Sequence, residues 1–220
     1  MKPRIALKNT LKSIALGLAL MLLTTLCYGQ ATYKGPPHNV IYTNGADSNG
    51  NDSFPELANT AYTDVIVNFL TVDSNCKLKD QPSPSQSEMQ TLHNAGKTVL
   101  IAFGNSTSAA YQACSNDIGS LTKQIADYVY ANGFNGVDID FEDDNAFLNP
   151  SDPHYSGYDG VYFLTQLTND LWDQLNQPPF LAQNIITHAP QTNYWLQNYN
   201  YPSPPIRRGV FASGWFYRVV

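Results

Sequence analysis

Positive charge is scarce in this 220-residue chain, which has 12 lysine and arginine residues against 18 aspartate and glutamate residues. That balance disfavours nucleic acid as a partner, because nucleic acids are themselves strongly negative. Several motifs are also missing: no glycine-rich phosphate loop follows the first expected strand, no serine stands in a nucleophile elbow, and the four histidines lack metal-site spacing. We therefore expect no metal and no other cofactor.

A long apolar run is likewise missing, with one short exception near the N-terminus. Four basic residues precede the apolar residues 14–23, a run shorter than the ~20 residues that cross a membrane. Small residues at Cys27 and Gly29 suit cleavage before Gln30. We interpret residues 1–29 as a secretory signal peptide in preference to a membrane anchor. The remaining chain would be extracellular, without a membrane contact and with a net charge of −10.

Only three cysteines are present, and cleavage would leave two of them, Cys76 and Cys114. An oxidising compartment favours their pairing, with two separate buried thiols as the alternative. Asn51 begins an N-glycosylation pattern in a polar loop, and Asn105 begins a second such pattern.

With 43% hydrophobic residues the composition is globular, and one folded domain is expected. Short apolar runs alternate with segments of helical periodicity. The expected strands cover residues 39–43, 63–72, 97–103, 134–142 and 184–188. The expected helices cover residues 85–94, 118–132 and 161–171. No hairpin signal separates the strands, so the order predicts a parallel α/β sheet, either doubly wound or a (β/α)₈ barrel.

The fourth expected strand carries Asp138, Asp140 and Glu142 at alternate positions. Alternate residues share one face of a strand, so the carboxyl groups form a row about 6.6 Å apart. Burial and mutual repulsion raise the pKa of at least one of them, as a general acid requires. A solvent-facing strand is disfavoured by the apolar neighbouring strands, and a calcium loop by the apolar Ile139 and Phe141.

Residues 136–142, Gly-Val-Asp-Ile-Asp-Phe-Glu, resemble the D-G-x-D-x-D-x-E signature of family 18 glycoside hydrolases, the chitinases and their relatives. Asn135 replaces the first aspartate, at a position we expect to be structural. Residues 185–191 are similar to the fifth-strand T-A-A-P-Q motif of plant and fungal class III chitinases, whereas residues 102–105 depart from the third-strand S-x-G-G pattern. The resemblance covers about residues 38–198 and implies the (β/α)₈ barrel.

The resemblance also implies a role for each acid. Glu142 matches the acid that protonates the glycosidic oxygen. Asp140 matches the residue that stabilises the substrate's own N-acetyl group as it attacks the anomeric carbon, and Asp138 the carboxylate that positions Asp140. This retaining, substrate-assisted reaction differs from the usual two-carboxylate scheme. The implied partner is chitin or an N-acetylglucosamine oligosaccharide.

Other expectations concern the sugar site and the disulfide. Tyr42, Phe69 and Gln191 lie near expected strand ends and are candidates to line a sugar site, with ordinary packing as the alternative. Cys76 and Cys114 follow neighbouring strands, whose loops lie side by side in a barrel, and this favours the bridge.

The family's sixth-strand tyrosine and eighth-strand tryptophan have no counterpart, and about five of the eight strands are found. We expect a catalytic domain over residues 30–205, an incomplete barrel with exposed strand edges, and an atypical tail over residues 206–220, as in a truncated or mis-spliced product. The leading hypothesis is a secreted, monomeric chitinase. The alternatives are an inactive chitin-binding lectin, an endo-β-N-acetylglucosaminidase acting on N-glycans, and a non-functional fragment.

Overall fold

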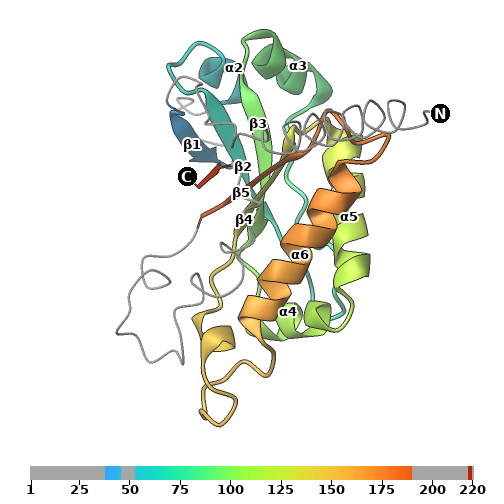
Figure 1. The fold of residues 1–220 in the computed structure, drawn as a ribbon. Coiled ribbons are helices and arrows are strands. Elements are labelled where there is room, and N and C mark those ends of the chain that lie inside the picture. The colour runs from blue at the N-terminus through green and yellow to red at the C-terminus, as the bar shows by residue number, and fades with distance from the viewer. Residues whose placement is uncertain (1–37, 46–52, 190–217, 220) are drawn as a thin grey trace, which may run out of the picture. The chain divides into compact units, whose positions relative to one another are not determined.

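The computed structural model describes residues 38–45, 53–189 and 218–219, and a parallel sheet forms its centre (Figure 1). The strands follow one another across the sheet in chain order, and each neighbouring pair is parallel. This order is that of a barrel wall and confirms the predicted fold class, here as an open sheet over the described residues. The strands are β1 (Val40–Thr43), β2 (Asp64–Leu70), β3 (Thr98–Gly104), β4 (Gly136–Asp140), β5 (Ile185–His188) and β6 (Arg218–Val219).

Helices fill the connections between the strands. The three predicted helices are present as α3 (Gln86–Asn94), α5 (Ile118–Asn132) and α6 (Gly160–Leu175). Three shorter ones had no sequence prediction: α2 (Phe54–Leu57), α4 (Ser108–Ser115) and the 3₁₀ helix η1 (Asp144–Phe147). A capping box begins α3, since the Ser85 hydroxyl accepts from the Glu88 amide while the Glu88 carboxylate accepts from the Ser85 amide. No described helix combines the length and apolar character needed to cross a membrane.

Alternate residues of the strands separate into two apolar clusters. One lies under α4, α5 and α6, on one side of the sheet in Figure 1, and includes Val99, Val137 and Ile186. The other is small and centres on Ile66, Leu100 and Ala102. Each fully buried aliphatic side chain contributes about 1.5–3 kcal/mol, so the helix-covered cluster supplies most of the stability. The opposite face holds this small cluster together with polar groups, such as Asp138 beside Ala102.

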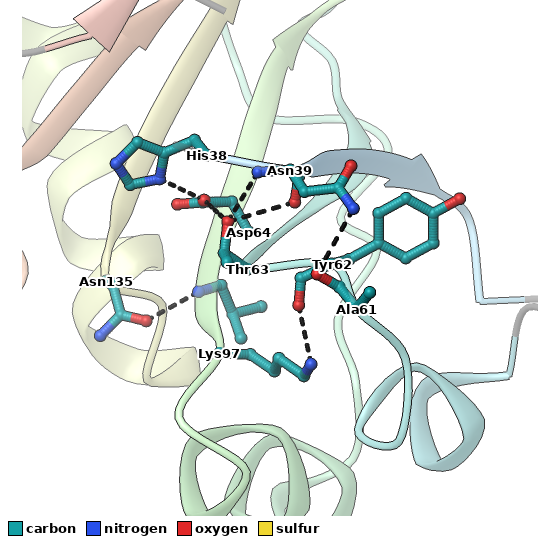
Figure 2. Close-up of polar contacts among 9 residues, drawn as sticks. His38, Asn39, Ala61, Tyr62, Thr63, Asp64, Lys97 and Asn135 are labelled. Atoms are coloured by element: carbon teal, nitrogen blue, oxygen red, sulfur yellow. Dashed lines mark hydrogen bonds and ion pairs between the residues drawn. The ribbon is translucent and has the colours of Figure 1, made fainter. Parts of the chain in front are cut away.

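Polar contacts gather where the strands begin (Figure 2). His38 Nδ1 lies 2.5 Å from Asp64 Oδ2, and the Lys97 ammonium donates to the Tyr62 backbone oxygen at 2.7 Å. The same ammonium donates to the Thr60 backbone oxygen at 2.7 Å. Asn135 Oδ1 accepts from the Val99 amide at 2.8 Å. An amide oxygen accepts a hydrogen bond just as a carboxylate oxygen does. Asn135 can therefore replace the first aspartate of the motif, and its contact with Val99 is structural.

A disulfide joins Cys76, in the loop after β2, to Cys114, with the two Cα atoms 4.9 Å apart. The predicted pairing is confirmed, although Cys114 lies on α4 instead of in a loop. Of the expected tail, the structure describes only the backbone of β6, which pairs with β5.

Candidate active site

Asp138 is completely buried in the middle of β4 on the face turned away from the helices. The Tyr42 hydroxyl, on β1, donates to Oδ2 at 2.8 Å, and the Thr187 hydroxyl, on β5, donates to Oδ1. Burial raises the pKa of Asp138, while the hydrogen bonds from Thr187 and Tyr42 act in the opposite direction. With both oxygens accepting from the protein, Asp138 is placed to support its neighbours.

Asp140 is the last residue of β4 and is partly exposed. Burial, followed by the charges of Glu142 and Asp138, raises its pKa to about 6. Gly104 lies beside it on β3, where a Cβ atom would stand 2.3 Å from the Asp140 backbone oxygen, so a larger residue would force the strands apart. Because its pKa is about 6, the Asp140 carboxyl group can gain or lose a proton near neutral pH.

Glu142 lies two residues beyond the end of β4 and is exposed. The prediction that the strand continues to Glu142 is wrong in this detail, because the sheet ladder ends at Asp140. The alternation nevertheless persists: Phe141 is buried, and Glu142 faces solvent. The three acids thus pass from buried through partly exposed to exposed along one line.

Of the three residues predicted to line a sugar site, the structure describes Tyr42 and Phe69. Tyr42 is 36% exposed, and its hydroxyl donates directly to Asp138. Phe69 is partly buried against the Ile66, Leu100 and Ala102 cluster. Gln191 and Asn51 lie outside the described residues. Contact between a sugar and Tyr42, Phe69 or Gln191 stays a prediction.

Thr187 is the functional residue that the sequence left without a role. It is the register partner of Asp138 on one side, and Ala102, which has no hydroxyl, is the partner on the other. The donor that β3 cannot supply therefore comes from β5. The motif over residues 185–191 contained Thr187, but only the register of two strands 49 residues apart in sequence reveals its partner.

The acids do not build a metal site. In the described part of the chain, no three histidine, cysteine, aspartate or glutamate side chains gather as metal ligands. What the arrangement offers is proton chemistry: one exposed carboxyl group, one that titrates near neutral pH, and one held in place behind them.

Several solved structures that resemble this chain are chitinases. A GH18 chitinase from Pseudoalteromonas aurantia is 30% identical with a TM-score of 0.63, over 75% of this chain and 60% of that one. A GH18 chitinase from Chromobacterium violaceum is 20% identical with a TM-score of 0.53, over 81% and 50%. A chitinase from Bacteroides thetaiotaomicron is 18% identical with a TM-score of 0.52, over 71% and 47%. The last two likenesses concern the fold alone.

The first likeness extends to the sequence and confirms the relationship that the acidic motif predicts. The chain spans between about half and three fifths of the length of these structures. No family model matches the chain, and no curated protein matches it.

Proposed function

We propose that this chain, a relative of the GH18 chitinases in sequence and fold, is a secreted glycoside hydrolase that cleaves β-1,4-N-acetylglucosamine linkages in chitin. One observation carries the proposal: Asp138, Asp140 and Glu142 stand in a line of rising exposure, with the outermost acid open to a substrate. Active sites of (β/α)₈ enzymes lie at this carboxyl end of the strands.

The proposed reaction uses Glu142 and Asp140 directly. Glu142 donates its proton to the glycosidic oxygen, the bond to the anomeric carbon breaks, and the oxygen of the substrate's own acetamido group forms a new bond to that carbon. The Asp140 carboxylate stabilises the positive charge that develops on the acetamido group. Water then attacks the anomeric carbon, the bond from that carbon to the acetamido oxygen breaks, and the attacking water gives a proton to Glu142, which restores the enzyme.

Asp138 has a supporting part in this scheme. Its two hydroxyl donors fix it behind Asp140, and its charge is one of the causes that raise the Asp140 pKa. Asp140 therefore retains its proton to a higher pH than an ordinary aspartate does.

The proposal is tested by comparing an N-acetylated chitin tetramer with the same oligomer after removal of its acetyl groups. Turnover of the first alone is expected, since only it carries the internal nucleophile. Equal turnover of both oligomers would contradict substrate assistance. Binding to insoluble chitin without release of reducing ends would indicate a lectin, and release of high-mannose glycans from a glycoprotein would indicate an endo-β-N-acetylglucosaminidase.

Secretion is part of the same proposal. It is supported by the basic and apolar pattern of residues 1–29 and by the Cys76–Cys114 disulfide, a bond typical of oxidising compartments. A polymeric substrate outside the cell requires such a location.

A further inference from the structure

The residue after Glu142 is an aspartate that faces the opposite way. Asp143 is only 7% exposed, and both of its carboxylate oxygens accept a hydrogen bond from a hydroxyl group. Ser156 Oγ donates to Oδ1 at 2.7 Å, and the Tyr158 hydroxyl donates to Oδ2 at 2.8 Å. A buried carboxylate with two such donors is held in one orientation.

Both donors belong to the returning part of the loop between β4 and α6. Tyr158 is buried, and its ring meets Phe163 of α6 edge-on, with centroids 5.8 Å apart. The Ser156 amide donates to the Asn145 backbone oxygen at 3.3 Å. Asp143 therefore ties the outgoing part of the loop to a return segment that is itself fixed against α6.

The residue before Glu142 is anchored as firmly. The Phe141 ring packs against Tyr111, Phe147 and Phe163, with centroid distances of 4.8, 5.7 and 5.8 Å. Glu142 thus stands between two buried anchors, one aromatic and one polar. Phe141 is part of the hydrophobic core, whereas the hydrogen bonds of Asp143 hold only the loop.

We propose that Asp143 is a positioning residue for Glu142, an inference that rests on the proposed function. The Glu142 side chain is exposed and beyond the strand, so the sheet itself does not fix its backbone. Proton transfer demands hydrogen-bond geometry, and a displacement of about 1 Å costs a catalyst on the order of 100-fold in rate. Asp143, Ser156 and Tyr158 supply the missing constraint.

The test separates proton donation from general folding. The variants S156A and Y158F each remove one donor to Asp143, and S151A and Y155F are matched controls on the same loop. Each purified full chain is assayed on the N-acetylated chitin tetramer and on a dinitrophenyl glycoside of diacetylchitobiose. The nitrated phenol leaves as an anion, so its departure does not need the proton of Glu142.

For S156A and Y158F we expect kcat on the tetramer to fall about 10- to 100-fold with KM within about twofold, and kcat on the dinitrophenyl glycoside to change little. The controls should match the wild type on both substrates. Equal losses on the two substrates, or no loss on either, would overturn the positioning role. A wild type that cleaves neither substrate would overturn the proposed function itself. If Y158F fails to fold, S156A alone decides, because Ser156 is only half-buried.

Discussion

At the residue scale, the fold tolerates the completely buried carboxyl group of Asp138 because each of its oxygens accepts a hydrogen bond. Removing one donor would leave a buried carboxyl oxygen without a hydrogen-bond partner, and the lost hydration of that oxygen would then destabilise the fold. The same reasoning applies to Asp143 with its two hydroxyl donors. Both carboxyl groups are therefore held in place by their donors, as the proposed roles of Asp138 and Asp143 require.

Replacing Thr187 by valine is expected to lower the free energy of unfolding by about 1–3 kcal/mol, because Asp138 loses a donor at constant side-chain shape. Thr122 offers a matched control, since its buried hydroxyl has no hydrogen-bond partner among the described residues. T122V should change the free energy of unfolding by less than about 0.5 kcal/mol or stabilise the fold. Urea unfolding at neutral pH measures both, and equal losses would contradict the account.

Asp140 gives a prediction with a defined sign. Its pKa in the folded chain, about 6, lies above its ordinary value of 3.8, so the fold binds this proton more tightly than the unfolded chain does. The resulting stability is present below pH ~4 and is lost as the pH rises through about 6. D140N, which does not titrate, should gain about 1–2 kcal/mol relative to the wild type between pH ~4 and ~7. Urea unfolding of both proteins across this pH range measures the difference in free energy of unfolding. A difference that does not vary with pH would refute the raised pKa of Asp140.

The sequence predicts the acids, which follow from local alternation, but not the hydrogen bonds made to them, which depend on strand register. The row of Asp138, Asp140 and Glu142 follows from period two along one segment. The donors to the row, Tyr42 and Thr187, come from strands 96 and 49 residues away. No local pattern states which residues of distant strands stand side by side.

At the scale of the elements, length decides which helices the sequence predicts. The long helices α5 and α6 carry a full apolar stripe, and the sequence predicts them within a few residues. α2 and η1 have four residues each, too few for any periodicity to appear. The end of β4 was also missed, because alternation continues past Asp140 although the neighbouring strands no longer pair there.

The loop after β2 and the helix α4 are connected by the Cys76–Cys114 bridge, which closes a segment with a sequence separation of 38 residues. Loop-closure entropy predicts that the double variant C76A/C114A loses about 4 kcal/mol in the free energy of unfolding. Denaturant unfolding measures the loss, and thiol titration of the unreduced mature chain is its control. Two free thiols in that titration would contradict the bridge.

At the scale of the whole molecule, the two ends of the sheet have different tasks. Contacts at the strand beginnings, among them His38 with Asp64 and Asn135 with Val99, hold backbone segments together (Figure 2). The acids are at the other end, where the loop between β4 and α6 carries Glu142. This separation of stability from chemistry is typical of (β/α)₈ proteins.

The proposed secretion of the chain can also be tested on the whole molecule. Expressed in a secretion-competent host, the protein is expected in the medium with Gln30 as its first residue, because residues 1–29 match a signal peptide. N-terminal sequencing of the secreted product gives the answer. A chain retained in the membrane fraction with Met1 intact would show that the segment is an anchor.

The most direct test of the account is the turnover and the binding of one N-acetylated chitin tetramer by the wild type and by E142Q. We expect kcat to fall by about 10²- to 10⁴-fold in E142Q, while the dissociation constant from titration calorimetry stays within about twofold, because glutamine keeps the shape and loses only the proton. Unchanged turnover in E142Q would remove Glu142 from the reaction and contradict the central claim.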